Sequence, residues 1–199
     1  MIKQLAKIVH RTANRLLDQL NEVIDWAKKQ SEKTNFNPKK LRLSNGITES
    51  LELLKPNASQ KSIRLENKIP KDIYVNADSL MLRSIVQNLV ANAIKYTPQG
   101  GLVVINAELD KGMVRVFVED SGVGMTDEMR EKLFDRGNNP SLSGTNNEMG
   151  TGLGLLLVND FVTQHGGTID VESAVGTGTI FRFTIPAVVE VSTSQGVKI

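Results

Sequence analysis

A strongly apolar helical segment followed by three short glycine signatures constrains this chain more than any other feature. The segment is QNLVANAIKYTP (residues 87–98), and the signatures are DSGVG (120–124), GTGLG (150–154) and GTGT (176–179). Glycines let a backbone turn tightly and approach a ligand closely. One such signature alone is common in ordinary turns, but the ordered set after an apolar helix indicates a nucleotide pocket.

Two amides and a lysine share one side of this helix. At about 100° per residue, Asn88, Asn92 and Lys95 fall within an arc of about 60°. The adjoining arc is apolar and contains Leu82, Ile85, Val86, Leu89 and Ala93. Amide oxygens are ligands that suit Mg²⁺, and Lys95 adds a positive charge for phosphates. The alternative is a hydrated surface face, although asparagine is a mediocre helix former.

A carboxylate continues the apolar row of a predicted strand. The segment MVRVFVED (113–120) alternates with period two, and Asp120 has the same parity as three buried positions, namely Val114, Val116 and Val118. A buried carboxylate needs donors, which the amine of adenine and nearby waters would supply. Gly122 and Gly124 would then let the backbone approach a flat ring. The competing interpretation is a simple β-turn built on Asp-Ser-Gly.

The second glycine signature runs into a predicted helix, GTGLGLLLVNDFV (150–162). Backbone N–H groups at such a helix start bind phosphate. Neither G-x-G-x-x-G nor GxxxxGK[ST] is matched, so a Rossmann turn and a P-loop are both excluded. Residues 135–149 are polar with glycine and proline, which predicts a lid over the triphosphate.

The last predicted strand ends its apolar face in a hydroxyl. Thr179 shares that face with Phe181, Phe183 and Ile185. If this strand pairs with the strand that carries Asp120, the Thr179 hydroxyl lies near the carboxylate. The alternative is that Thr179 is simply a good β-former.

Taken together, these motifs resemble the catalytic, ATP-binding domain of sensor histidine kinases, of the GHKL superfamily. NLVANAIKYTP looks like the N box of that family, DSGVGM the G1 box, LFDR (133–136) the F box, and GTGLGLLLV and GTGTIF the G2 and G3 regions. The segment QHGGTIDVESAVG (164–176) matches as well, and the resemblance covers residues 46–186.

The resemblance implies a role for each matching residue. Asn92 would hold Mg²⁺ with Asn88 beside it, and Asp120 would bind adenine. Phe134 would anchor the lid, and Arg136 would lie near the γ-phosphate, although Gly137 replaces a second aromatic of the family. The remaining nucleotide contacts would come from Lys95, Tyr96, Gly122, Gly124, Gly150, Gly152, Gly154, Leu155 and Thr179.

The residue at position 88 distinguishes the histidine kinases from related ATPases. Gyrase, mismatch-repair and chaperone ATPases of this fold carry a glutamate there, whereas this chain carries Asn88. An amide cannot act as a general base, so phosphoryl transfer is favoured over hydrolysis. Two alternatives stay open: a nucleotide-sensing or docking module without transfer activity, and a GHKL-type ATPase.

Residues 2–30 carry apolar side chains at bundle spacing, which predicts a long helix. In the family a two-helix hairpin precedes the catalytic domain, forms homodimers and carries the phosphorylated histidine. This segment looks like the second helix only, because His10 is followed by Arg11 and no proline follows. We therefore expect the phosphoacceptor histidine on another helix of a longer kinase, and a response regulator downstream. We expect His165 to cap the C-terminus of a helix.

Composition limits the remaining possibilities. The chain has 199 residues, 40% of them hydrophobic, and no cysteine. No apolar run approaches about 18 residues, so we expect a cytoplasmic portion, even if the parent protein is membrane-anchored. The basic stretch 28–40 predicts a solvated linker. Nucleic-acid binding is not expected, because the chain has only six Phe, two Tyr and one Trp.

The predicted organisation has three parts. Residues 1–45 would form the dimerisation segment and linker, 46–186 the catalytic domain, and 187–199 a tail or further linker. Within 46–186 we expect helices at 46–60 (interrupted near Pro56), 78–96 and 152–165. Strands are expected at 62–69, 73–76, 102–109, 113–120, 168–173 and 179–185. This order predicts an α/β two-layer sandwich of the Bergerat (GHKL) type, preceded by the long bundle-type helix.

Overall fold

The computed structural model describes residues 36–134, 144–146 and 153–188. The helices are α2 (Leu43–Gln60), α3 (Ser79–Tyr96), α4 (Asp127–Glu131) and α5 (Leu153–Gln164). The strands are β1 (Lys39–Arg42), β2 (Arg64–Asn67), β3 (Tyr74–Ala77), β4 (Leu102–Asp110), β5 (Met113–Asp120), β6 (Ile169–Ala174) and β7 (Gly178–Pro186). The predicted helix over 2–30 lies outside the described residues.

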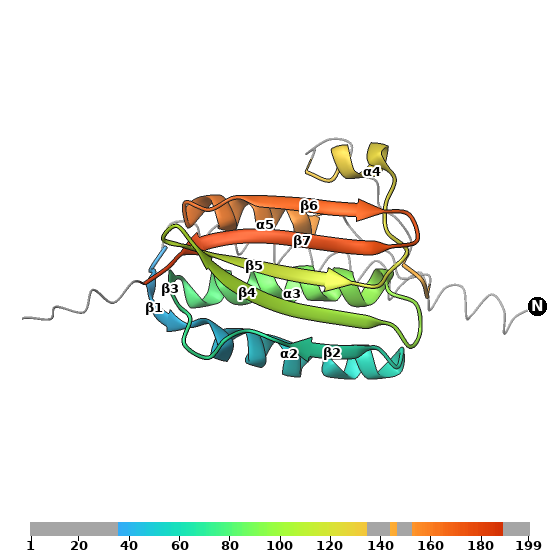
Figure 1. Ribbon diagram of the computed structural model, residues 1–199, viewed down its shortest axis with the longest axis horizontal. Coiled ribbons are helices and arrows are strands. Elements are labelled where there is room, and N and C mark those ends of the chain that lie inside the picture. Colours follow the sequence, from blue (N-terminus) through green and yellow to red (C-terminus); the bar gives the residue numbers. More distant parts are fainter. Residues whose placement is uncertain (1–35, 135–143, 147–152, 189–199) are drawn as a thin grey trace, which may run out of the picture.

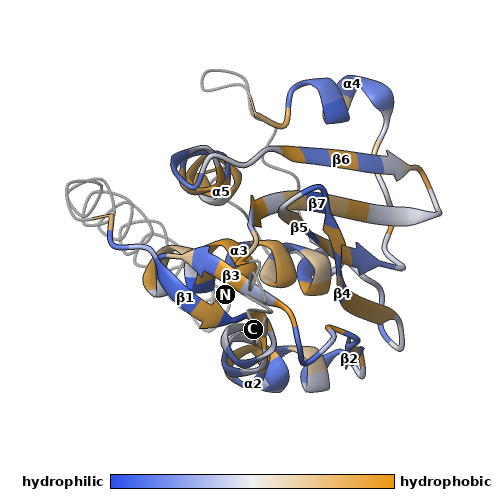
Figure 2. Ribbon diagram, turned by 60° about the vertical axis from the view of Figure 1, so that its left-hand side comes forward, coloured by the Kyte–Doolittle hydropathy of each residue, from blue (hydrophilic) through white to orange (hydrophobic). Residues whose placement is uncertain are grey.

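Two layers make up the fold, as predicted. A five-stranded sheet of order β2-β4-β5-β7-β6 forms one layer, and α2, α3 and α5 cover one of its faces (Figure 1). The pair β2–β4 is parallel, and the other neighbours are antiparallel. Helix α3 lies between α2 and α5 and is largely hydrophobic, whereas α4 is hydrophilic (Figure 2).

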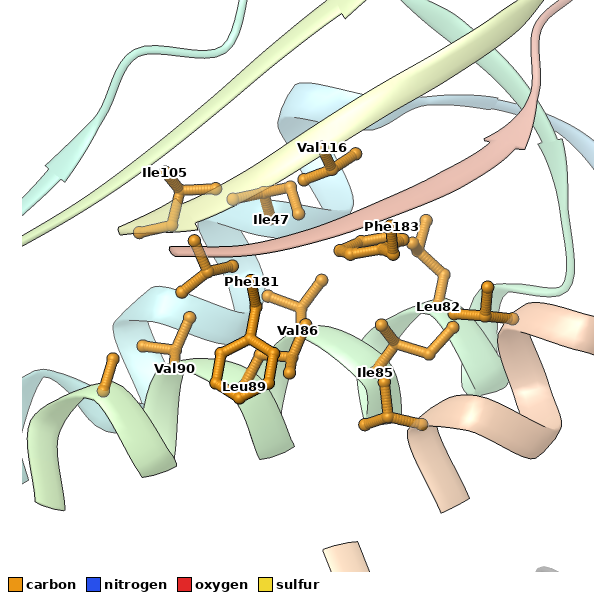
Figure 3. Close-up of a cluster of buried hydrophobic side chains, with 14 of the residues drawn as sticks. Ile47, Leu82, Ile85, Val86, Leu89, Val90, Ile105, Val116, Phe181 and Phe183 are labelled. Carbon is orange, nitrogen blue, oxygen red and sulfur yellow. The ribbon is translucent and has the colours of Figure 1, made fainter. Parts of the chain in front are cut away.

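The core forms where α3 meets the inner face of the sheet (Figure 3). Each central strand buries every second side chain, as the period-two pattern predicts. On α3 the buried side chains recur at helical spacing. Fully buried members of this core include Ile85, Val86, Leu89, Val90, Ile105, Val116 and Phe183. This packing fixes the position of α3 on the sheet and its rotation about its own axis.

Regular secondary structure begins earlier in the chain than the sequence predicted. Residues 39–45, expected in a linker, form β1 and the first turn of α2. Strand β1 pairs antiparallel with β3 in a separate small sheet, and Leu43 is fully buried. The predicted linker is therefore wrong over 39–45, because Leu43 has partners in the core that local composition does not indicate.

Helix α2 is continuous, so the predicted interruption near Pro56 is wrong. Pro56 lies inside the helix on its exposed side. Proline removes one backbone donor and strains the preceding turn. The helix persists because its opposite side is buried on both sides of the proline, at Leu51 and Ala58. The short helix α4 was not predicted at all.

Candidate functional site

Helix α3 brings the predicted amides to the edge of the core. Its N-terminus is capped by Asp78, whose Oδ1 accepts from the backbone N–H groups of Leu80 (2.9 Å) and Met81 (3.1 Å). Asn88 and Asn92 are half-buried beside the fully buried stripe, where the helical arithmetic placed them. They therefore lie on the shoulder of the helix, facing neither the centre of the core nor open solvent.

The Asn88 amide has a defined orientation. Its Nδ2 donates to the backbone carbonyl of Ser84 at 2.8 Å, so Oδ1, at the opposite edge of the planar amide, points away from that carbonyl. A Cβ added at Gly154 would lie 2.6 Å from that oxygen. The missing side chain at Gly154 thus lets the first turn of α5 approach the amide oxygen. Two motifs far apart in the sequence meet at this point.

The end of α3 carries a paired cation and ring. Lys95 and Tyr96 are both half-buried, and the Lys95 Nζ lies 4.7 Å from the centroid of the Tyr96 ring. A cation at this distance from an aromatic ring is attracted to it. The carbonyl of Tyr96 accepts from the backbone N–H of Val123 at 3.1 Å. The C-terminus of α3 is thereby joined to the loop that follows Asp120, at one end of the molecule (Figure 1).

Asp120 and Thr179 are cross-strand partners. Strands β5 and β7 pair antiparallel with Asp120 opposite Thr179, which confirms the predicted pairing of these strands. Both side chains are only 6% exposed. On both strands the inward-facing row consists of apolar side chains, mainly valines and phenylalanines, and Asp120 and Thr179 lie at one end of that row. A carboxylate and a hydroxyl therefore lie on paired residues at the end of an otherwise apolar row.

Burial controls the charge of Asp120. Loss of solvent raises the pKa of its carboxyl to about 6, and the nearby Glu119 adds to this shift. Hydrogen bonds from the backbone of Gly122 and Thr179 favour the charged form but do not offset the burial. The Gly122 N–H donates to Oδ1 at 2.8 Å. The carboxyl thus keeps a raised pKa even though two backbone groups donate to it.

Two glycines make this turn possible. A Cβ at Gly122 would lie 2.5 Å from the Asp120 Oδ1 and 2.7 Å from the carbonyl oxygen of Tyr96. Gly124 has a φ of +66°, and a Cβ there would lie 1.9 Å from the carbonyl oxygen of Ala174. Larger residues at either position would displace backbone. The loop therefore needs glycine for its close approach to neighbouring protein atoms, and the predicted approach of the backbone to a flat ring stays a prediction.

Ser173 is a residue of this site that the sequence analysis missed. Its hydroxyl donates to the carbonyl of Gly178 (2.9 Å), lies 3.0 Å from the Thr179 hydroxyl, and accepts from the backbone N–H of Met125 (2.9 Å). Ser173 is buried at the inward parity of β6. That parity is the signal that could have indicated it. Its bonds hold β6, β7 and the loop before α4 together beside Asp120.

The remaining predicted residues differ in what the structure describes. Phe134 packs against the core, and Leu155 is itself a buried member of it. Arg136, Gly150 and Gly152 lie outside the described residues, as does the predicted lid except for 144–146. Within the described ranges, the structure contains no group of three or more His, Asp or Glu side chains that could hold a metal ion.

His165 occupies the helix end where a capping histidine was predicted. Its Nε2 accepts from the backbone N–H of Asp78 at 3.0 Å, so the proton lies on Nδ1, which donates to the carbonyl of Phe161 at 2.7 Å. The capping prediction is confirmed. The same ring also joins the end of α5 to the start of α3.

Comparison with known proteins identifies the family. The profile of the histidine kinase-, DNA gyrase B- and HSP90-like ATPases matches residues 77–189. The chain belongs to this family. The matched region is therefore an ATP-binding domain of this family. Among the described residues, no helix is long and apolar enough to cross a membrane.

Individual relatives are histidine kinases. The histidine protein kinase DivJ of Caulobacter vibrioides is 33% identical over 184 residues, which cover 92% of this chain and 31% of the relative. The chain thus spans about a third of the length of that relative.

Solved structures agree with this assignment. The catalytic domain of the histidine kinase ThkA superposes with a TM-score of 0.66 at 30% identity, over 75% of this chain and 95% of that domain. ThkA in complex with the response regulator protein TrrA matches with a TM-score of 0.66 at 26% identity, over 88% and 50%. Full-length ShkA in complex with AMPPNP matches with a TM-score of 0.62 at 28% identity, over 77% and 31%.

Proposed function

We propose that this chain is the catalytic part of a protein-histidine kinase, which binds Mg-ATP and presents its γ-phosphate to a histidine on another helix. The observation that carries the proposal is the buried Asp120 opposite Thr179, beside a glycine turn that no side chain could occupy. A buried carboxylate at this position can accept a hydrogen bond from the exocyclic amine of adenine. The related ShkA has a structure in complex with AMPPNP, which supports nucleotide binding by this chain.

The rest of the site suits the phosphates. Lys95 supplies a cation beside the end of α3, and the start of α5 at Gly154 offers backbone N–H groups to an anion. Asn88 and Asn92 supply neutral amide oxygens, a donor type that fits Mg²⁺. When bound, Mg²⁺ would neutralise charge that develops on the phosphates. Asn92→Ala should therefore weaken Mg²⁺-dependent nucleotide binding without unfolding the domain, which calorimetry and circular dichroism together can measure.

Asn88 favours transfer over hydrolysis. Its amide donates to the Ser84 carbonyl and has no proton-accepting nitrogen, so it cannot deprotonate a water molecule. Catalysis then depends on positioning ATP in line with an acceptor supplied from elsewhere. We further propose that residues 2–30 are the second helix of a dimerising hairpin in a cytoplasmic homodimer. The ThkA–TrrA complex supports a response regulator as the downstream partner.

Radiolabelled ATP tests this proposal. The chain alone should not become stably phosphorylated, whereas a hairpin carrying the parent's phosphoacceptor histidine should acquire acid-labile label slowly. Asp120→Asn is the control variant and should reduce that label when ATP is below the concentration that saturates the wild type. Label on this chain that disappears in His10→Gln would contradict the assignment of the acceptor. Bound nucleotide with label on neither protein would instead favour a sensing module, and phosphate release abolished by Asn88→Ala would favour an ATPase.

A further inference from the structure

Lys61 is a buried lysine that the proposed chemistry does not use. It follows α2 directly and is only 4% exposed. Its Nζ donates to the carbonyls of Ile94 (2.8 Å) and Lys95 (2.9 Å) and to the Thr145 hydroxyl (2.6 Å). An ammonium group has three N–H donors and can donate to all three of these acceptors at once.

The end of α3 has a specific need for this lysine. The carbonyl of Ile94 would normally accept from the residue four positions later, but that residue is Pro98, which has no N–H. Lys61 supplies the missing donor from a different part of the chain. A cation at the C-terminus of a helix is also favoured by the helix dipole. The position and the charge of Lys61 thus both suit this helix end.

Thr145 attaches a third segment at the same point. It lies in the sequence between α4 and α5, and its backbone N–H donates to the Lys95 carbonyl at 3.1 Å. Its hydroxyl accepts from Lys61 and lies 3.0 Å from the Thr97 carbonyl, to which it can donate. The Lys95 carbonyl already accepts from Lys61 and from the Thr145 N–H, so donation by the Thr145 hydroxyl to Thr97 gives the Ile94, Lys95 and Thr97 carbonyls a donor each.

We propose that Lys61 and Thr145 are positioning residues for the phosphate side of the nucleotide site. This inference rests on the proposed function. The short stretch Ile94–Thr97 is held by three separate segments: Lys61 after α2, Thr145 before α5, and Val123 in the Asp120 loop. Lys95 belongs to this stretch, so its backbone is fixed where its ammonium group can meet phosphates. Removal of the Thr145 hydroxyl should loosen the backbone that carries Lys95, and it should leave the adenine contact at Asp120 intact.

Two matched substitutions at Thr145 test the proposal. Thr145→Val keeps the shape and loses the hydroxyl, and Thr145→Ser keeps the hydroxyl. We expect Thr145→Val to weaken Mg-ATP binding about tenfold, and Thr145→Ser to restore it to within about twofold of wild type, measured by calorimetry. Adenosine binding, followed by NMR titration, should stay within about twofold in both variants, because the Asp120 contact does not involve Thr145.

Each contrary result has a separate meaning. Equal weakening of Mg-ATP and adenosine in Thr145→Val would overturn the proposal, because it would indicate a general loosening of the fold. Unchanged Mg-ATP affinity in Thr145→Val, or no rescue in Thr145→Ser, would overturn it as well. If the wild-type chain binds neither ligand, the proposed function fails, and the positioning role fails with it. The control Asp120→Asn should lose adenosine affinity, which the Thr145 variants keep.

Discussion

Asp120 at the end of β5 and Lys61 after α2 are both buried charged groups, but they differ in how well the surrounding protein stabilises the charge. The Lys61 ammonium meets three acceptors within 2.9 Å. The Asp120 carboxyl receives backbone donors from Gly122 and Thr179, yet its burial still raises its pKa to about 6. Both residues are at most 6% exposed, so burial alone does not explain the difference.

The difference lies in how completely each charge is satisfied. A charge whose donors and acceptors are matched inside the protein contributes to stability and has little capacity left for a ligand. A buried charge whose hydrogen bonds do not compensate for the lost solvent reduces stability in the free protein, but it gains strongly when a ligand adds a further donor. We therefore interpret Lys61 as part of the support of the site and Asp120 as part of its binding surface. Three experiments can break or sharpen this contrast.

The largest expected effect is on stability, from Lys61→Met. This change keeps much of the volume but removes the donor to the Ile94 carbonyl, which has no replacement because residue 98 is proline. Leaving buried polar groups unsatisfied costs about 3 kcal/mol in the free energy of unfolding, measured by denaturant titration. Lys68→Met is the control, because Lys68 is an exposed residue paired with Glu66. Equal stability of the two variants would show that Lys61 is not a structural anchor.

Asp120→Asn should have the opposite effect to Lys61→Met, because it should lower nucleotide affinity and not stability. We expect nucleotide affinity to fall about tenfold or more, since a charge-assisted hydrogen bond contributes roughly 1.5–3 kcal/mol. The free variant should be at least as stable as wild type at pH 7, because the buried charge is gone. Calorimetry and thermal unfolding of the same sample measure both quantities. A variant that binds normally would reject the adenine contact, and one that unfolds would make Asp120 a structural residue.

The last expected effect is a pH dependence that belongs to Asp120. Its pKa in the folded protein, about 6, exceeds the ordinary value of 3.8, so the folded state binds a proton more readily than the unfolded chain. The stability that this group contributes is therefore complete below about pH 4 and is lost as the pH rises through 6. The loss is at most about 3 kcal/mol.

Ligand binding should show the opposite trend. Adenosine affinity should weaken as the pH falls below about 6, because a protonated carboxyl is a poorer acceptor. NMR titrations at several pH values measure this, and Asp120→Asn should remove both trends. A wild-type profile that is flat between pH 4 and 7 would contradict the raised pKa.

Much of the site could be predicted because it depends on local periodicity. Helical spacing placed Asn88 and Asn92 at the edge of the buried stripe of α3, and strand parity placed Asp120 and Thr179 in one inward row. Side chains three or four apart on a helix, or two apart on a strand, share a face whatever the rest of the chain does. The functional roles of these residues stay predictions, as do those of Arg136, Gly150 and Gly152, which lie outside the described residues.

The sequence by itself determined the two-layer sandwich and its main helices and strands. It also determined which polar side chains lie at the edge of the apolar stripe of α3 and at the ends of the inward-facing strand rows. Only the tertiary structure decided which distant groups meet them. Lys61 reaches α3 from 33 residues away, Ser173 joins Thr179 across β6 and β7, and His165 receives the N–H of Asp78. Such contacts have no local periodicity, because they arise only when separate elements pack. Once these polar groups are buried, leaving one without a hydrogen bond is costly, so the folded structure pairs each of them with a partner from another element.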